Sequence, residues 1–396
     1  MICIVLGTRP EIIKMSPIIR ECEKRKLDYF ILHTGQHYSY EMDRIFFEEL
    51  GLPAPGVNIE AGSGTHGAQT GEILAGVERE LIERDMAGSP DMVAQADKMK
   101  EKDQVSLKND PGNVPDIVLV QGDTNTVLAG ALAAVKLHIP VGHVEAGLRS
   151  FDRNMPEEIN RVVADHISDL LFAPTSTAHL NLIREGLPED RIFVTGNTVV
   201  DAVYENLGIA EHKFRNRSDL AAGNLHLEKG KFALVTAHRA ENVDIQSRLQ
   251  AILSGLGDLH RETGMPVVFP VHPRTAKMMD HYRLIPEGVT LSKPVGYLEF
   301  LRLESNAGLI LTDSGGIQEE SCVLRVPCVT LRDTTERPET LVVGSNILAG
   351  ADRRRILESS LSMLQKPTDW ENPYGDGHSG RRIVGIIEDN PTVHMN

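Results

Sequence analysis

The sequence is poor in cysteine. Only four of its 396 residues are cysteines, and no two of them form a CxxC pair. Small extracellular domains rely on denser disulfide frameworks, and zinc or redox sites need thiols at short spacing. We therefore expect reduced thiols that are buried or incidental, as in a cytoplasmic protein.

Long hydrophobic runs are also absent. No apolar stretch approaches the roughly 20 residues that a membrane-spanning helix needs. The first apolar run covers residues 2–6 and ends at Gly7, which is too short for the core of a secretory signal peptide. Both absences lead us to expect no membrane partner and a cytoplasmic location.

Basic residues are the scarcer charge type. The chain has 41 lysines and arginines against 56 acidic residues, a net charge of −15. Such a surface repels nucleic acid and anionic membranes, so neither is expected as a partner. A small anionic ligand would need a locally positive cleft, which directs attention to arginines and lysines beside glycine turns.

What the sequence does contain is an ordinary globular composition, 41% hydrophobic and 24% charged. At roughly 150 residues per domain, the length predicts two or three domains. Buried strands are predicted at residues 2–6, 29–32, 116–121, 141–143, 169–173 and 192–195, with helical patterns between them. Regular patterning then stops over residues 206–231 and resumes with strands at 231–236, 267–271, 289–291, 309–311 and, as the last, 328–331.

This alternation predicts an α/β protein with two Rossmann-like parallel-sheet domains, the first at residues 1–205 and the second at 206–372. The remaining residues, 373–396, are expected to form a C-terminal helix that packs back on the first domain. Residues 84–113 are polar and lack a strong apolar face, so we expect a surface insertion there, with a short helix near 92–102.

Residues 309–320 (LILTDSGGIQEE) are the most informative stretch. An apolar strand end leads into a Ser-Gly-Gly turn, and a helix is predicted from Ile317. Glycines allow close approach of a ligand, and the first N–H groups of a helix bind anions. Ser314 could donate its hydroxyl, and Glu320 could accept from a ribose diol. An ordinary strand-to-helix turn explains these twelve residues equally well.

Other cations and histidines also follow predicted strands. Arg9 and Lys14 lie in and after the first glycine turn, where they could face an anion or simply be solvated. His238 could be a satisfied histidine, a phosphate donor or an acid–base group. Arg337 could be a surface charge or a bidentate phosphate ligand.

Three carboxylates, Asp123, Glu145 and Glu157, lie at or just beyond the carboxyl ends of neighbouring strands. Ligands bind at that edge of an open parallel sheet. Each residue taken alone could be a helix cap, and Glu157 could simply favour the start of its own helix. Together they are candidate acid–base groups.

A metal site is not predicted. His33 and His37 have the spacing of a ligand pair only in a helix, and Gly35 between them argues against one. The sequence also lacks an HExxH motif.

Nine segments together resemble the non-hydrolysing UDP-N-acetylglucosamine 2-epimerases, in the order of that family and over nearly the whole chain. They are GTRPEIIK (7–14), QGDTNT (121–126), HVEAGLR (143–149), MPEEINR (155–161), TGNTVVDA (195–202), TAHRAEN (236–242), TDSGGIQEE (312–320), RDTTERPE (332–339) and NPYGDG (372–377). The resemblance implies a GT-B arrangement, in which the two domains face a cleft, and a homodimer without metal or nicotinamide cofactor.

The activity implied by the resemblance is the interconversion of UDP-GlcNAc and UDP-ManNAc, in which UDP is eliminated to give 2-acetamidoglucal and then adds back. The implied catalytic residues are Asp123, Glu145, Glu157 and His238. The implied substrate-binding residues are Arg9, Lys14, Phe300, Ser314, Gly315, Gly316, Glu320 and Arg337, with Phe300 packed on the uracil. The implied contacts to a second, activating UDP-GlcNAc are Gln36, Gln69, Arg239 and His272.

Three other functions fit parts of this pattern. A GT-B glycosyltransferase would share the UDP site but need an acceptor groove. A hydrolysing epimerase would release UDP and free ManNAc, and a nucleotide-sugar sensor would bind without turnover. The three carboxylates at one sheet edge favour epimerisation.

Overall fold

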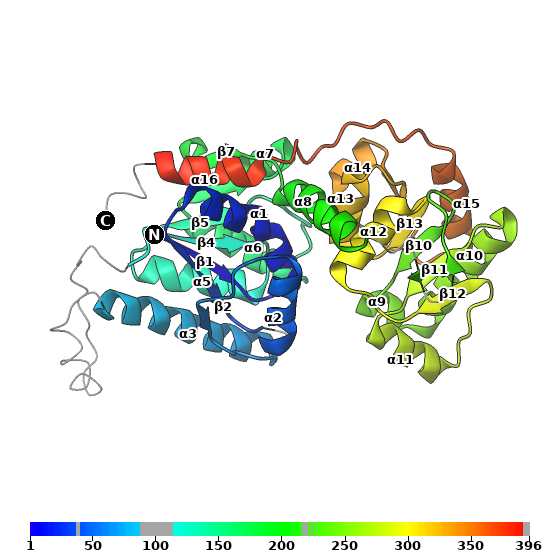
Figure 1. Cartoon of the computed structure of the whole chain (residues 1–396), viewed down its shortest axis with the longest axis horizontal. Helices are drawn as coiled ribbons and strands as arrows, with labels where there is room; N and C mark the ends of the chain where they lie inside the picture. Colours follow the sequence, from blue (N-terminus) through cyan, green and yellow to red (C-terminus); the bar gives the residue numbers. More distant parts are fainter. Residues whose placement is uncertain (37–39, 88–113, 216–220, 223–224, 391–396) are drawn as a thin grey trace. The chain divides into compact units, whose positions relative to one another are not determined.

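The structure is a computed structural model that describes residues 1–36, 40–87, 114–215, 221–222 and 225–390. The chain divides into two compact units, coloured along the sequence in Figure 1. Unit 1 comprises Met1–Ala202 and the C-terminal segment from Gly375, and unit 2 comprises Val203–Tyr374. The short helix expected near 92–102 and nearly all of the expected insertion lie outside the described residues.

Unit 1 is built on a seven-stranded sheet in the order β3-β2-β1-β4-β5-β6-β7, and every neighbouring pair is parallel. The strands are β1 (Ile2–Leu6), β2 (Tyr29–His33), β3 (Val57–Asn58), β4 (Ile117–Gln121), β5 (Val141–Val144), β6 (Leu170–Ala173) and β7 (Ile192–Val194). The chain order reverses between β1 and β4. In open α/β sheets such a switch point opens a crevice beyond the carboxyl ends of the strands.

Helices connect these strands and cover the sheet. They are α1 (Arg9–Arg25), α2 (Tyr40–Glu49), α3 (His66–Ala87), α5 (Asn125–Lys136), α6 (Pro156–Ile167), α7 (Ser176–Arg184), the 3₁₀ turn η1 (Glu189–Arg191) and α8 (Thr198–Lys213). Pro10 stands in the first turn of α1, where a missing N–H costs nothing. Gly130 lets α5 approach the sheet, because a Cβ there would lie 3.1 Å from Val5.

The C-terminal helix α16 (Ser379–Asp389) packs against α1 in unit 1 (Figure 1). A Cβ on Gly380 would lie 3.0 Å from Pro17, so glycine permits the close contact. The N–H of Gly380 donates to the Asp201 carboxylate over 2.9 Å. These contacts fix the end of the described chain to helices α1 and α8 of unit 1.

Unit 2 repeats the plan with a six-stranded parallel sheet in the order β12-β11-β10-β13-β14-β15. The strands are β10 (Ala233–Thr236), β11 (Val267–Pro270), β12 (Val289–Ser292), β13 (Leu309–Thr312), β14 (Cys328–Thr330) and β15 (Asn346–Leu348). The switch point here lies between β10 and β13. A two-stranded antiparallel pair, β8 (Ala221–Ala222) and β9 (Leu225–His226), precedes the sheet.

The helices of unit 2 are α9 (Ala240–Val243), α10 (Gln246–Thr263), α11 (Pro273–Tyr282), α12 (Tyr297–Asn306), α13 (Gly315–Val323), α14 (Pro338–Val342) and α15 (Arg353–Leu364). Alternate strand residues face two separate cores. Val235 joins one core with residues of α10 and α15, whereas Leu234 joins the other with Leu303 of α12. Because both faces are covered, the central strands β11 and β13 are buried and largely apolar.

Most predicted strands are confirmed to within two residues. Two predictions are wrong. Residues 328–331 are not the last strand, because the short β15 pairs with β14 along Cys328↔Asn346. The helix expected from Ile317 begins at Gly315. Several elements were not individually predicted: strand β3 and helices α2, α7, α9, α10, α11, α14 and α15. Within the described residues, no helix is long and apolar enough to span a membrane.

Candidate active site

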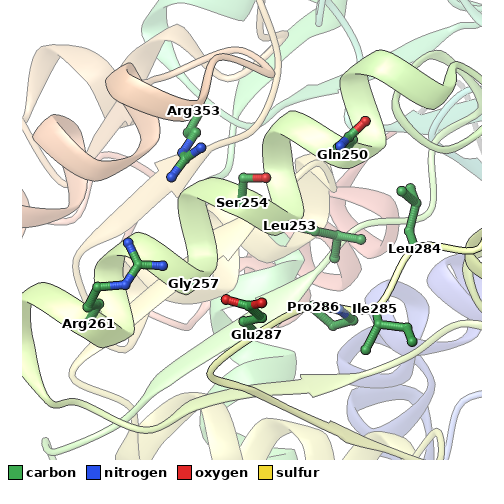
Figure 2. A pocket seen from close by; sticks show the side chains of 10 residues that line it. All are labelled: Gln250, Leu253, Ser254, Gly257, Arg261, Leu284, Ile285, Pro286, Glu287 and Arg353. Atoms are coloured by element: carbon green, nitrogen blue, oxygen red, sulfur yellow. The ribbon is translucent and has the colours of Figure 1, made fainter.

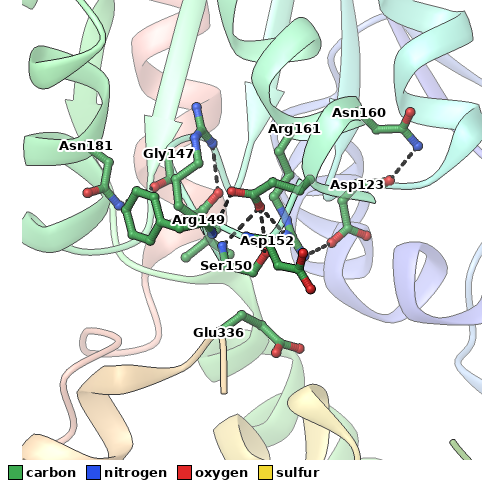
Figure 3. Close-up of polar contacts among 12 residues, drawn as sticks. Asp123, Gly147, Arg149, Ser150, Asp152, Asn160, Arg161, Asn181 and Glu336 are labelled. Carbon is green, nitrogen blue, oxygen red and sulfur yellow. Dashed lines mark hydrogen bonds and ion pairs between the residues drawn. The ribbon is translucent and has the colours of Figure 1, made fainter. Parts of the chain in front are cut away.

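The crevice edge of unit 1 carries Asp123, two residues beyond β4. Its carboxylate forms an ion pair with Arg161 of α6, and its carbonyl oxygen accepts a 2.9 Å hydrogen bond from the Asn160 amide (Figure 3). The Asp123 side chain is 31% exposed. The carboxylate is therefore held in place by a cation and still accessible to a small molecule.

Glu145 follows β5 directly and is held by three donors. Its carboxylate is 2.6 Å from the Lys14 ammonium and 2.8 Å from the Asn197 amide, and it also accepts from the Gln121 amide. The residue has a φ of 70°, in the left-handed region that non-glycine residues rarely adopt. Backbone strain of this kind costs about 1–3 kcal/mol and is concentrated at functional sites. The structure thus brings two predicted site residues, Lys14 and Glu145, into direct contact.

Glu157 and its neighbour Glu158, both in the first turn of α6, have different surroundings. Glu158 is buried and accepts from the N–H groups of Ser150 and Phe151 at 3.0 and 2.9 Å and from Arg161 at 2.7 Å. It therefore fixes the loop before the helix. Glu157 is half-buried and, within the described part of the chain, has no hydrogen-bonding or ionic partner. Of the two glutamates, Glu157 is the one available to a ligand.

Beneath this edge lies His143, whose role the sequence analysis missed. Its Nδ1 is 2.6 Å from the Asp165 carboxylate and its Nε2 is 2.8 Å from the carbonyl oxygen of Gly122. Because both ring nitrogens face acceptors, the imidazole donates from both and is a cation. Burial alone would lower the pKa of His143, but the Asp165 charge outweighs it and raises the pKa. The imidazolium thus fixes the turn that carries Asp123.

Glu11 is a second residue that the sequence analysis missed. It accepts from the N–H groups of Gly7 and Thr8 at 2.6 and 2.9 Å and from the Thr124 hydroxyl. Burial raises the pKa of Glu11 to about 7, because its hydrogen-bond donors are uncharged and only partly offset the loss of water. Glu11 ties the turn after β1 to the turn after β4.

The remaining predicted residues of unit 1 gather near these turns. Arg9 starts α1 and lies 5.8 Å from the ring of Phe46. The amide of Gln69 donates to the backbone carbonyl of Gln36 over 2.9 Å. The side chain of Gln36 in turn accepts from the Thr126 hydroxyl over 2.8 Å. Both glutamines are 4% exposed, so the structure brings them together as part of the support for α5.

In unit 2, the turn after β13 has the geometry of an anion site. Ser314 occupies the N-cap position of α13, and its hydroxyl makes no capping hydrogen bond. Gly315 has no room for a side chain, because a Cβ would lie 2.6 Å from an oxygen of Glu336. The first N–H groups of α13 and a hydroxyl therefore converge at one helix start, as phosphate binding requires.

Asp313 organises the neighbouring loop. It is fully buried and accepts from the N–H groups of His238 and Arg239 at 3.0 and 2.9 Å. The His238 Nδ1 is 3.3 Å from the same carboxylate, and the side chain is 43% exposed. The rings of His238 and His272 have centroids 5.7 Å apart. Burial and the nearby His238 lower the pKa of His272.

A cluster of arginines surrounds Glu336. The Glu336 carboxylate is 2.8 Å from Arg332 and 3.4 Å from Arg239. Burial opposes ionisation of Glu336, but the charges of Arg337, Arg332 and Arg239 outweigh it and lower the pKa to about 2. The predicted ligand Arg337 is 7% exposed, and its Nε is 2.6 Å from Glu319. The structure thus places Arg337 in a buried ionic network beside the glycine turn.

Glu320 and Phe300 complete the predicted residues. Glu320 lies one turn into α13, is 6% exposed and accepts from the Tyr297 hydroxyl over 3.3 Å. Phe300 lies on α12 and packs, half-buried, against the core that contains Leu234. Both lie in unit 2 with Ser314.

Unit 2 also has a pocket at the edge of the sheet opposite to the glycine turn. Its volume is about 270 Å³, and Figure 2 shows α10 with Arg353 and residues 284–287 around it. Residues 284–287 precede the amino end of β12, whereas the glycine turn follows the carboxyl end of β13. This pocket is therefore separate from the candidate site. Within the described residues, no cluster of three histidine, cysteine or acidic side chains could hold a metal ion.

The chain is similar to known proteins over nearly its whole length. A family model described as UDP-N-acetylglucosamine 2-epimerase matches residues 20–97 and 111–388. The chain belongs to the UDP-N-acetylglucosamine 2-epimerase family. An epimerase of that name from Methanocaldococcus jannaschii is 52% identical over 389 residues, which cover 97% of this chain and 98% of the relative. One from Methanococcus maripaludis is 50% identical with 97% of each chain covered.

Solved members of the family have the same fold. The crystal structure of the M. jannaschii UDP-GlcNAc 2-epimerase in complex with UDP-GlcNAc and UDP gives a TM-score of 0.81 at 51% identity, covering 98% of this chain and 99% of that one. The Neisseria meningitidis enzyme bound to UDP-GlcNAc gives 0.81 at 32% identity, covering 98% and 100%. The predicted α/β class with two Rossmann-like domains of the GT-B type is confirmed.

Within this epimerase family member, the predicted residues separate by unit. Unit 1 carries Asp123, Glu145, Glu157, Arg9, Lys14, Gln36 and Gln69, and unit 2 carries His238, Arg239, His272, Phe300, Ser314, Gly315, Gly316, Glu320 and Arg337. The residues that sequence analysis missed are mostly their partners, such as Arg161, His143 and Glu336. The segments QGDTNT, HVEAGLR and RDTTERPE contain Gln121, His143 and Glu336. These residues lie close in sequence to predicted site residues, and that closeness was the signal that could have identified them.

Proposed function

We propose that this protein catalyses the reversible epimerisation of UDP-GlcNAc to UDP-ManNAc at C2, by elimination of UDP to 2-acetamidoglucal and re-addition of UDP. The observation that carries the proposal is the sheet edge of unit 1. There Asp123 and Glu145 are each paired with a cation, and Glu157 lies in the first turn of α6, the helix that supplies Arg161 to Asp123. Two relatives that are at least 50% identical bear the name of this epimerase.

Unit 2 is proposed to bind the UDP group. The first N–H groups of α13 and the Ser314 hydroxyl would bind the diphosphate, which suits the positive end of a helix. Glu320 would accept from the ribose hydroxyls, and Phe300 would pack on the uracil. A related crystal structure is described as containing UDP-GlcNAc and UDP, which supports a nucleotide-sugar ligand.

The proposed elimination explains why carboxylates are needed. The C2–H bond is not acidic, so it breaks readily only as the C1–O bond to UDP loosens and positive charge develops at C1. A carboxylate takes the C2 proton, and the electron pair of the C2–H bond forms the C1=C2 double bond while UDP leaves with the C1–O pair. Re-addition reverses these steps, with the proton delivered to the other face of C2.

The surroundings of each carboxylate suggest its part. Asp123 is accessible and is held in place by its ion pair with Arg161, so it is placed to act as the base. Glu145 is buried among three donors, so it is placed to stabilise positive charge at C1 rather than to move. Glu157, half-buried at the start of α6, would exchange the proton on the second face.

His238 and the cations are proposed to retain the departing UDP. Asp313 holds Nδ1 of His238, and the half-exposed ring can then donate to the leaving phosphate. Arg9, Lys14 and Arg337 would add positive charge around the diphosphate. A second UDP-GlcNAc would contact Gln36, Gln69, Arg239 and His272 as an activator. A homodimer and a cytoplasmic location stay predictions.

Product analysis tests the proposal. UDP-GlcNAc alone is incubated with the protein, and proton and phosphorus NMR follow the nucleotide sugars. We expect UDP-ManNAc to appear up to an equilibrium ratio, without accumulation of free UDP.

Each rival gives another result. Free UDP that rises in step with ManNAc would identify a hydrolysing enzyme, and turnover only after addition of an acceptor would identify a glycosyltransferase. Binding without turnover would identify a sensor. A relative from Pseudomonas aeruginosa, 40% identical over 97% of this chain, is named UDP-2,3-diacetamido-2,3-dideoxy-D-glucuronate 2-epimerase, so turnover of that sugar nucleotide alone would overturn the substrate assignment.

A further inference from the structure

Two acidic side chains are neighbours in the interior of unit 2, and one of them is the proposed ribose ligand Glu320. Glu304 lies in the last turn of α12 and is fully buried, and Glu320 lies on α13 with 6% exposure. Glu320 is the charged neighbour of Glu304, and the two carboxyl groups are within hydrogen-bonding reach of each other. Two carboxylates cannot bond to each other unless one carries a proton.

The surroundings show which carboxyl carries it. In the described part of the chain, neither oxygen of Glu304 has an N–H or O–H donor within reach, so nothing there stabilises a charge on Glu304. Burial and the neighbouring Glu320 raise the pKa of Glu304 well above its ordinary value. Glu320, in contrast, accepts from the Tyr297 hydroxyl over 3.3 Å. Glu304 is therefore the neutral acid and Glu320 the anion.

Tyr297 belongs to the same network. Its phenol is buried, and the side chain of Asn206 is hydrogen-bonded to it. Burial and the Glu320 charge raise the pKa of Tyr297, so its hydroxyl keeps its proton and can donate. Glu320 thus has two neutral donors behind it, one from each end of α12.

A buried pair of carboxyl groups lowers the stability of the fold, so a functional role is needed to explain it. Burying a carboxyl group costs free energy that an apolar side chain of similar length would not cost, and Glu304 is fully buried. A carboxylate accepts about four hydrogen bonds, so two rear donors are compatible with a diol that binds from the front.

We propose that Glu304 is a positioning residue for ribose recognition: as a neutral acid it donates to Glu320 and, together with Tyr297, keeps the Glu320 carboxylate anionic and oriented toward the 2′- and 3′-hydroxyls of the nucleotide. This inference rests on the proposed function, because it assumes that UDP binds at the start of α13. Glu304 acts through Glu320 and touches no substrate atom.

The test compares two ligands that differ only in the ribose. The dissociation constants of UDP and of 2′,3′-dideoxyuridine diphosphate are measured by calorimetry for the wild type, Glu304→Gln and Glu304→Met. Glutamine keeps a donor toward Glu320, whereas methionine keeps the length and loses the donor. Glu262→Gln, on the exposed side of α10, is the matched control.

We expect the wild type to prefer UDP by roughly tenfold or more, the value of one or two hydrogen bonds to a charged group. Glu304→Gln and Glu262→Gln should keep that preference within about threefold, and Glu304→Met should lose most of it with little change for the dideoxy ligand. With UDP-GlcNAc as substrate, Glu304→Met should raise KM and leave kcat nearly unchanged. Tyr297→Phe, which removes the second donor, should lose part of the preference and tests the network should Glu304→Met not fold.

Other results overturn the inference in distinguishable ways. Equal loss of affinity for both ligands in Glu304→Met would show a structural role only, and an unchanged preference would show no role. Loss of the preference in Glu304→Gln as well would contradict the donor role. A wild type that binds UDP without preference would overturn the inference alone, whereas a wild type that does not bind UDP would overturn the proposed function with it.

Discussion

Each unit has a buried glutamate that holds the loops at the carboxyl edge of its sheet, and the two behave in opposite ways. Glu11 in unit 1 is 2% exposed and has its pKa raised to about 7 by burial. Glu336 in unit 2 is 5% exposed, yet its pKa is lowered to about 2. Glu11 receives only amide and hydroxyl donors, whereas Glu336 faces three guanidinium groups. The charge of the partners, not the depth of burial, decides the outcome.

The same contrast distinguishes the two candidate edges. In unit 2 the arginines around Glu336 outnumber it, which suits an edge that binds a diphosphate. In unit 1 Asp123 is paired with Arg161 and Glu145 with Lys14, which suits the proposed edge of carboxylates beside a developing positive charge. This contrast supports the proposed division, in which binding belongs mainly to unit 2 and chemistry mainly to unit 1.

The largest expected effect is a loss of turnover when the carboxylates of unit 1 are neutralised. Asp123→Asn and Glu145→Gln keep the shape and lose the charge, so turnover of UDP-GlcNAc should fall roughly 10²–10⁴-fold, the usual contribution of a positioned acid–base group. The dissociation constant of UDP, measured by calorimetry, should change by no more than about twofold. Asp190→Asn, exposed at the amino edge before β7, is the control and should leave both unchanged. Unchanged turnover in Asp123→Asn would remove its proposed role.

The next effect concerns acid stability of unit 2. The folded pKa of Glu336 is about 2 and the unfolded value is 4.5, so its ionisation stabilises the fold above pH 4.5 and the stabilisation is lost as the pH falls toward 2. The pKa difference corresponds to about 3 kcal/mol of unfolding free energy. Trp370, the one tryptophan of the chain, is buried in unit 2 and donates to the Cys322 carbonyl, so its fluorescence follows urea unfolding there. Glu336→Gln should flatten the pH dependence between 2 and 4.5; an equally steep loss in the variant would refute this cause.

Glu11 should show the reverse dependence, of similar size. Its folded pKa of about 7 lies above the unfolded 4.5, so the stabilisation from its bound proton is complete below pH 4.5 and is lost as the pH rises to about 7. Differential scanning calorimetry of the wild type and Glu11→Gln between pH 4.5 and 8 measures this. Glutamine cannot lose a proton, so its Tm should fall less over that interval. A wild-type Tm that rises relative to the variant would contradict the assignment.

The smallest effect separates the two glycines of the 314–316 turn. Gly315→Ala places a methyl group 2.6 Å from Glu336, so it should destabilise unit 2 by about 1–3 kcal/mol, the usual cost of overpacking. At Gly316 the nearest atom to such a methyl group is Ser314 Oγ at 3.9 Å, so Gly316→Ala should change stability by less than about 1 kcal/mol. Urea unfolding followed by Trp370 compares them. Equal destabilisation would contradict the difference in packing.

Much of the fold follows from sequence because parallel strands covered on both faces are continuous apolar runs. β1 and β4 are such runs, and the glycine turns after them mark their carboxyl ends. β15 was missed because its three residues give no such signal. The start of α13 was placed at Ile317 because glycine is a poor helix former, although Gly315 and Gly316 form its first turn.

The candidate site residues were predictable where they directly follow an apolar strand. Residues directly after strands, such as Asp123 and Glu145, were predictable from position. Their partners were not, because contacts such as that between Thr124 and Glu11, 113 residues apart, depend on strand order. The same reason hid the Glu304–Glu320 pair, since a sequence does not show that side chains of two successive helices are neighbours in the fold.

Deuterium incorporation tests the central claim most directly. The protein is incubated with UDP-GlcNAc in deuterated water, and the C2 position of both sugar nucleotides is read by NMR and mass spectrometry. If a carboxylate of unit 1 removes the C2 proton, UDP-ManNAc will carry deuterium at C2 in the wild type, and Asp123→Asn will neither exchange nor epimerise at a comparable rate. UDP-ManNAc that keeps the original C2 hydrogen would contradict the account.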